Sequence, residues 1–204
     1  KKSQDNYFSD FYIWKDPKKD GGEPNNWGSN FGGSAWTYCE ERQQYYLHYY
    51  GKQQPDLNWE NPKVRQAIYD VMRYWKAHGV DGWRMDVITS ISKNQSFPDN
   101  ANPHGLKYVV GNQNNGPRMH EFIHEMNQEV LEPFHMMSVG EAPDSKSKDT
   151  RSLVDPMRKE LNMVFTFEHM HVDRKPGNVN GRWAIQPVDI VQLKKILFDW
   201  QKNL

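Results

Sequence analysis

Apolar residues recur at helical spacing between residues 62 and 78, near the middle of the chain. Asn61 is suited to cap the start of this segment, Pro62 fits the first helical position, and Gly79 is a typical stop signal. The pattern therefore predicts a helix over residues 62–78. The predicted buried face of this helix comprises Val64, Ala67, Ile68, Val71, Met72 and Trp75.

Three short apolar runs predict strands at residues 80–88, 136–140 and 162–167. Helical patterns lie between and after them: one helix from about residue 120 to 131, a short helix in the polar segment after residue 141, and a last helix that starts near residue 187. Strands that alternate with helices favour right-handed βαβ units around a parallel sheet. The apolar side of the last helix carries Ile190, Leu193, Ile196, Leu197 and Trp200.

Residues 1–55 lack this regularity and contain turn signals such as the glycine pairs at 21–22 and 32–33. The pattern predicts a loop-rich subdomain with a small core of its own. A wall of aromatic side chains that faces a ligand is the alternative interpretation. The aromatic residues scattered among the turns are Trp14, Trp27, Phe31, Trp36, Tyr38, Tyr45, Tyr46, Tyr49 and Tyr50.

Charge and cysteine content exclude several classes of protein. The 26 Lys and Arg residues balance 26 Asp and Glu residues, so the net charge gives no reason to expect nucleic acid or an anionic membrane as a partner. The single Cys39 rules out an internal disulfide. No apolar run approaches the roughly 18 residues of a membrane span. These features predict a soluble globular protein.

Two carboxylates stand where an apolar strand gives way to a polar loop. Asp86 lies near the end of the first predicted strand and Glu141 follows the second, so both are expected at the carboxyl edge of a parallel sheet, where ligands bind. Arg84, two residues before Asp86, points to the same face of its strand. Paired carboxyl groups of this kind suit glycoside hydrolysis. A structural salt bridge, or helix capping by the two acids, is the alternative.

Five stretches of the sequence resemble one enzyme family. Residues 79–88 (GVDGWRMDVI) resemble the nucleophile strand of the alpha-amylase superfamily, glycoside hydrolase family 13, and residues 138–141 (SVGE) resemble its acid/base strand. Residues 54–59 (QPDLNW) are similar to a segment shared by its oligo-1,6-glucosidase and related members. Residues 25–36 are similar to the domain inserted after the third barrel strand, and residues 165–169 (FTFEH) to the sixth strand.

The resemblance implies a role for each residue that matches a family motif. It implies that Asp86 is the nucleophile, that Glu141 is the general acid and base, and that Arg84 is the partner of the nucleophile. Val87 matches a position where valine accompanies a preference for α-1,6 bonds, whereas small or hydroxylated residues accompany α-1,4 bonds. Retention of configuration then predicts carboxyl groups about 5 Å apart.

Three aromatic residues match positions that wall the glucose pocket in such enzymes: Phe31, Tyr50 and Phe167. Ordinary packing is the alternative for each of them. The chain departs from the commoner family pattern at Tyr50 and Trp83, where Phe is more usual, and at residues 142–143, which follow the acid. These departures leave the proposed chemistry intact but weaken inferences about the leaving-group side.

The family's third carboxylate, an Asp within a His-Asp pair on the seventh strand, has no match in the sequence. A complete barrel of this type needs about 250 residues. The predicted fold is therefore α/β, a partial (β/α)8 TIM barrel with about strands four to six and the end of the inserted loop-rich domain. Residues 1–55 are assigned to the inserted domain and residues 56–204 to the barrel.

The predicted function is that of a retaining glycoside hydrolase that releases glucose from α-1,6-linked isomalto-oligosaccharides, as part of a longer enzyme. The alternatives are an α-1,4-glucosidase, a trehalose-6-phosphate hydrolase or a sucrose isomerase of the same superfamily, and a non-catalytic homologue or inert fragment. We expect no cofactor and no metal ion, an oligosaccharide as the substrate, a cytoplasmic location, and self-association of the truncated barrel through its exposed strand edges.

Histidines elsewhere in the chain are weaker candidates for chemistry. His120, His124 and Glu125 have helical spacing but lack the order of a zinc motif, so a solvated helix face is expected. His169 and His171 alternate as residues at the edge of a strand do, which favours packing over metal binding.

Overall fold

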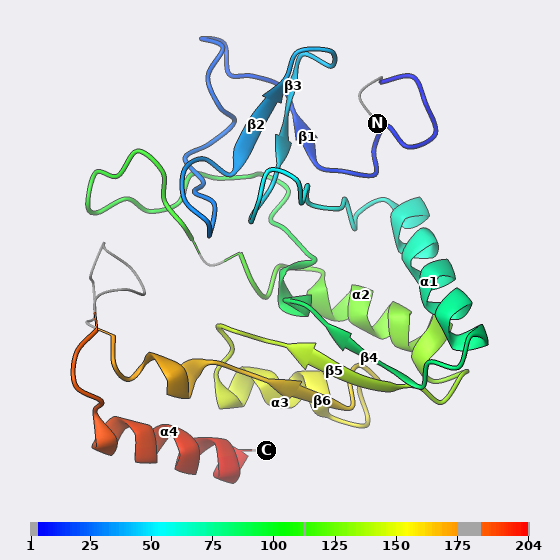
Figure 1. The fold of residues 1–204 in the computed structure, drawn as a ribbon, viewed down its shortest axis with the longest axis vertical. Coiled ribbons are helices and arrows are strands. Elements are labelled where there is room, and N and C mark those ends of the chain that lie inside the picture. Colours follow the sequence, from blue (N-terminus) through cyan, green and yellow to red (C-terminus); the bar gives the residue numbers. More distant parts are fainter. Residues whose placement is uncertain (1–3, 112, 175–184, 204) are drawn as a thin grey trace. The chain divides into compact units, whose positions relative to one another are not determined.

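The computed structural model describes residues 4–111, 113–174 and 185–203. The chain divides into two compact units, and the segment 93–113 interrupts the second unit and belongs to the first. The first unit comprises Lys1–Val71 and Lys93–Gln113, and the second comprises Met72–Ser92 and Asn114–Leu204. Each unit has its own sheet (Figure 1).

The first unit contains a small antiparallel sheet with the strand order β1-β3-β2. Its strands are β1 (Trp14–Lys15), β2 (Trp36–Cys39) and β3 (Gln44–Leu47). The predicted small core is confirmed, and it also includes one residue from the loop at 93–113. Its buried members are Ile13, Trp27, Ala35, Trp36, Leu47 and Phe97. The segment is loop-rich, as predicted, and its strands contain only two to four residues each.

Helix α1 (Pro62–Ala77) has the predicted extent, and Gly79, with φ of 92°, follows it in the left-handed conformation typical of a helix stop. Its buried face differs from the prediction. Tyr69 is almost fully buried, whereas Val71 and Trp75 each keep about half of their surface exposed (51% and 48%). The buried stripe is rotated around the helix axis, because spacing alone does not reveal which side of an apolar band is covered.

The second unit contains the predicted parallel sheet, with the strand order β4-β5-β6 (Figure 1). Its strands are β4 (Gly82–Met85), β5 (Met137–Glu141) and β6 (Met163–Phe165). The register pairs Arg84 with Val139 and Glu141 with Phe165. The carboxyl ends of all three strands therefore lie along one edge of the sheet.

Helices connect these strands. β4 is followed by a short 3₁₀ helix, η1 (Ile88–Ser90), and later by α2 (Met119–Met126), which continues into a π-helical turn, η2 (Asn127–Leu131). α3 (Ser147–Val154) links β5 to β6. The 3₁₀ helix η3 (Glu168–His171) and α4 (Ile190–Asn203) come after β6. None of the helices in the described part of the chain is both long and apolar enough to cross a membrane.

Two expectations for the end of the chain differ from the structure. His169 and His171 lie in η3 rather than at the edge of a strand, because β6 ends at Phe165 and the chain turns at once. The predicted apolar face of α4 is covered only in part, because Leu193 and Trp200 are half-buried and Ile190 is exposed. Ile196 is buried within α4, while Leu197 keeps 48% of its surface accessible.

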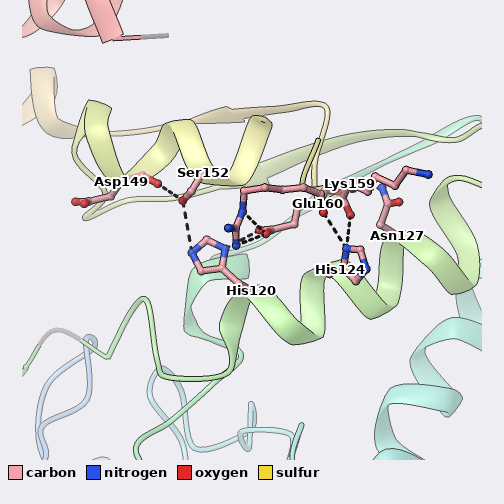
Figure 2. A network of polar contacts seen from close by, with 8 residues as sticks. His120, His124, Asn127, Asp149, Ser152, Lys159 and Glu160 are labelled. Atoms are coloured by element: carbon pink, nitrogen blue, oxygen red, sulfur yellow. Dashed lines mark hydrogen bonds and ion pairs between the residues drawn. The ribbon is translucent and has the colours of Figure 1, made fainter. Parts of the chain in front are cut away.

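The histidines of α2 bind the segment that precedes β6, rather than forming a purely solvated face (Figure 2). His120 Nδ1 lies 2.7 Å from Oε2 of Glu160, whose side chain is only 2% exposed. His124 Nδ1 lies 2.8 Å from the carbonyl oxygen of Arg158. These contacts attach α2 to residues 158–160. Among the residues that the structure describes, no group of three His, Cys, Asp or Glu side chains is placed to hold a metal ion.

Candidate active site

The carboxyl edge of the β4-β5-β6 sheet brings together an arginine and two carboxylates. Arg84 lies in β4, Asp86 follows that strand, and Glu141 is the last residue of β5. Arg84 Nη1 is paired with Oδ1 of Asp86, and its Nη2 is paired with Oε2 of Glu141. One guanidinium therefore bridges two carboxylates that are more than fifty residues apart in the sequence.

The two carboxylates have opposite surroundings. The side chain of Glu141 is 10% exposed, while that of Asp86 is 77% exposed. Burial raises the pKa of Glu141, and a hydrogen bond and the charge from Asp86 raise it further. The backbone N–H of Val87 and the charge of Arg84 oppose that rise, but the pKa remains above its ordinary value. Glu141 is therefore the member of the pair that is suited to hold and deliver a proton.

Arg84 is held in place by an aromatic ring as well as by the two acids. Its Cζ atom lies 5.2 Å from the centre of the Phe165 ring, in the range of a cation–π contact. The hydrogen bond to Asp86 is the main cause that raises the pKa of the guanidinium. Arg84 therefore acts as a permanent cation that orients both acids. No sequence motif marks Phe165 as a site residue, although the strand register places it opposite Glu141.

Val87 adopts a backbone conformation that a β-branched residue rarely takes. Its φ of 43° and ψ of 45° lie in the left-handed region, which normally favours Gly or Asn. Its N–H donates a hydrogen bond to Oε2 of Glu141 at 3.4 Å. Strained residues of this kind persist only where their surroundings hold them, and they are concentrated at functional sites. The conformation therefore links the turn after Asp86 directly to Glu141.

Phe167 lies just beyond the carboxyl end of β6, at the same edge of the sheet as the two acids. It is half-buried, and its ring centre lies 5.8 Å from that of Phe165 in an edge-on arrangement. Its position is compatible with a wall of a pocket, and the role in glucose binding stays a prediction.

Phe31 and Tyr50 form a separate group within the first unit. Their ring centres are 5.5 Å apart in an edge-on arrangement, and Phe31 is 67% exposed. Ser29 Oγ donates to the carbonyl oxygen of Tyr50 at 2.7 Å and accepts from the N–H of Phe31 at 3.1 Å. The Ser29 side chain therefore joins the backbone of Phe31 to that of the half-buried Tyr50. Its predicted part in a glucose pocket stays a prediction.

Comparison with known proteins gives a consistent result along the whole chain. The family model described as "Alpha amylase, catalytic domain" matches residues 1–204. An oligo-1,6-glucosidase of Heyndrickxia coagulans is 59% identical over 205 residues, which cover 100% of this chain and 37% of that protein. The chain therefore spans well under half the length of this curated relative.

Solved structures of other enzymes share the fold. A trehalose-6-phosphate hydrolase of Bacillus licheniformis has a TM-score of 0.88 and 44% identity, over 99% of this chain and 35% of its own. The isomaltulose synthase of Protaminobacter rubrum has a TM-score of 0.89 and 39% identity, over 99% of this chain and 36% of its own. Enzymes with different reactions thus share this part of the fold.

Proposed function

Because the chain belongs to the alpha-amylase catalytic-domain family, we propose that it supplies the nucleophile and the general acid/base of a retaining glycoside hydrolase. The third carboxylate of that family has no counterpart in the sequence, and the chain spans 37% of the Heyndrickxia coagulans relative. The proposed activity therefore belongs to a longer polypeptide that includes these residues, which is called the intact protein below.

The proposed reaction has two steps, and each uses both acids. An oxygen of Asp86 attacks the anomeric carbon of the terminal glucose, while Glu141 donates its proton to the glycosidic oxygen, which leaves with the rest of the sugar. Glu141, now ionised, then takes a proton from water, and the resulting hydroxyl displaces Asp86 from the anomeric carbon. The product is glucose with its original anomeric configuration.

The observation that carries this proposal is the unequal pair bridged by Arg84. A retaining mechanism needs one carboxyl group that is protonated before bond cleavage and one that is free to attack. Burial raises the pKa of Glu141, which suits it to the first role, while Asp86 is exposed and held by Arg84, which suits it to the second. A purely structural salt bridge would not require such different surroundings.

For the substrate, we propose α-1,6-linked isomalto-oligosaccharides. Val87 matches the position where valine accompanies α-1,6 preference in the resembled family, and the Heyndrickxia coagulans relative is an oligo-1,6-glucosidase. In this proposal Phe31, Tyr50 and Phe167 wall the glucose pocket. Residues 1–55 are the end of the inserted domain, and residues 56–204 belong to the barrel.

Hydrolysis of trehalose 6-phosphate is the second candidate. It is favoured by the similarity to the Bacillus licheniformis enzyme, with 44% identity and a TM-score of 0.88. Sucrose isomerisation has comparable structural support from the isomaltulose synthase. We further propose that the protein acts in the cytoplasm, without a nucleic-acid or membrane partner.

The test is product release by the intact protein from isomaltose, maltose, trehalose 6-phosphate and sucrose in parallel, with Asp86→Asn as the control. We expect glucose from isomaltose at the highest rate, with the anomeric configuration retained in nuclear magnetic resonance spectra. The substitution should abolish this release. Faster turnover of trehalose 6-phosphate or sucrose would assign the second candidate or the isomerase reaction instead. Activity that survives Asp86→Asn would contradict the mechanism.

A further inference from the structure

The side chain of Asn114 contacts both loops that follow the proposed catalytic strands. Its Oδ1 accepts hydrogen bonds from Thr89 Oγ1 at 3.0 Å and from Ser90 Oγ. Its Nδ2 donates to Oδ2 of Asp144 at 2.5 Å. Thr89 and Ser90 form part of η1, in the loop after β4, and Asp144 lies in the loop after β5. A single amide group thus joins the two loops.

The loop after β4 needs such an anchor because of Val87. This residue holds a left-handed conformation, which is strained for a β-branched side chain. The turn is closed by the N–H of Ser90, which donates to the carbonyl oxygen of Val87 at 2.9 Å. Fixing the hydroxyl groups of η1 therefore helps to fix Val87, whose N–H points at Glu141.

Asn114 is itself positioned by the backbone around it. The N–H of Asn115 donates to the carbonyl oxygen of Thr89 at 2.8 Å, and the N–H of Arg118 donates to Ser92 Oγ at 3.0 Å. A Cβ atom at Gly116 would lie 2.0 Å from the carbonyl oxygen of Ser92, so only glycine permits this close approach. Residues 114–118 are therefore pressed against residues 89–92, and the amide of Asn114 has a defined orientation.

We infer that Asn114 is a positioning residue, which keeps the turn after Asp86 and the loop after Glu141 at the spacing that the reaction requires. The inference rests on the proposed function. Asn114 forms hydrogen bonds with groups in the two loops that follow the reacting carboxylates. It acts through η1 on the Asp86 side and through Asp144 on the Glu141 side.

The two ends of this link can be exchanged to test it. Asn114→Asp keeps an acceptor for Thr89 and Ser90 but removes the N–H donor and places a second carboxylate against Asp144. Asp144→Asn keeps an acceptor oxygen for Asn114. The double variant N114D/D144N restores the hydrogen bond with its direction reversed. Asn115→Asp, one residue away, makes the same change of charge and tolerates the positive φ of that position (56°), so it is the matched control.

The experiment measures kcat and KM of the intact protein on isomaltose, together with the melting temperature of each variant. For Asn114→Asp we expect kcat to fall about tenfold to a hundredfold, the range for a small displacement of reacting groups, while KM changes less than about twofold. N114D/D144N should recover most of the lost kcat, and Asn115→Asp should lose little.

Two results would overturn the inference while the proposed function stands. One is a lower melting temperature with unchanged kcat in Asn114→Asp, which would make the link purely structural. The other is a loss of kcat that N114D/D144N does not restore. Inactivity of the unsubstituted protein on every glucoside would instead overturn the proposed function, and this inference with it.

Discussion

Glu141 and Asp86 differ in their solvent exposure, and the burial of Glu141 makes the stability of the fold depend on the protonation of that residue. Because burial raises the pKa of Glu141, the folded chain holds that proton more tightly than the unfolded chain does. The side chain of a Glu in an unfolded chain has a pKa of about 4.3. The stability gained from this proton is therefore complete below that pH and is lost as the pH rises through the higher pKa of the folded state.

We therefore expect Glu141→Gln to remove this part of the pH dependence. The unfolding free energy of the variant minus that of the parent should therefore increase between about pH 4 and pH 7. Urea unfolding at a series of pH values measures this difference. Parallel stability curves for the two proteins would contradict the assignment of a raised pKa.

The guanidinium of Arg84 pairs with two carboxylates at once through its two Nη atoms, and the single ammonium group of a lysine lacks this forked geometry. We expect Arg84→Lys to keep the positive charge but lower kcat on isomaltose about a hundredfold, because the acids lose their fixed orientation. The stability of the variant should change little, since the guanidinium is half-exposed. A kcat within twofold of the parent would show that charge alone is sufficient.

A substitution at Val87 tests the proposed preference for α-1,6 over α-1,4 bonds. Val87→Thr keeps the β-branched shape and hence the backbone strain, while it introduces the hydroxyl that accompanies α-1,4 preference in the resembled family. We expect the ratio of kcat/KM for isomaltose over maltose to fall roughly tenfold, a change typical for a small difference in a pocket. An unchanged ratio would mean that linkage preference is set elsewhere.

At the scale of the elements, the contact between α2 and the segment before β6 is a buried polar junction. His120 pairs with Glu160, whose side chain is 2% exposed, and Asn127 Nδ2 donates to the Glu160 carbonyl oxygen at 2.9 Å (Figure 2). Removing one partner of a buried carboxylate leaves a polar group that is no longer fully satisfied. The junction is thus expected to contribute to stability.

His120→Ala should lower the free energy of unfolding by about 1–3 kcal/mol, the cost of a buried polar group that loses a partner. His124→Ala is the matched control, because His124 is exposed and contacts backbone carbonyl oxygens instead of a buried acid. It should cost about 1 kcal/mol or less. Equal losses of unfolding free energy for the two variants in urea denaturation would show that His120 does not stabilise the buried carboxylate of Glu160.

The sequence predicted the parallel sheet of the second unit because contiguous apolar runs mark its strands, and it predicted the main helices because their apolar residues recur at helical spacing. The match to the alpha-amylase catalytic domain confirms the predicted fold, a part of a (β/α)8 barrel. The convergence of Arg84, Asp86 and Glu141 followed from parallel strands that end at one edge.

Other features depend on contacts that no local pattern contains. The strands of the first unit lie among turn signals and mix apolar with polar residues, so no local pattern marks them. Trp75 lies at a helical position that looks buried, yet it is half-exposed. The left-handed turn at Val87 and the hydrogen bonds of Asn114 depend on tertiary contacts. The residue types at these positions do not predict them.

At the scale of the whole molecule, the parallel sheet has two outer strands, β4 and β6. Unpaired strand edges favour association with another chain. We expect the 204-residue chain on its own to release no glucose from isomaltose or maltose and to self-associate in light-scattering measurements. A monomer that releases glucose, with the activity lost in Asp86→Asn, would show that these residues suffice for catalysis.

The most direct test of the account is to trap the covalent intermediate on Asp86. In the intact protein, Glu141→Gln cannot activate water, so an α-glucosyl fluoride, whose leaving group needs no acid, should glucosylate the nucleophile and remain attached. We predict that peptide mass mapping finds one glucosyl group, located on Asp86. A glucosyl group on another residue, or hydrolysis of the fluoride with inverted configuration, would contradict the retaining mechanism assigned to Asp86 and Glu141.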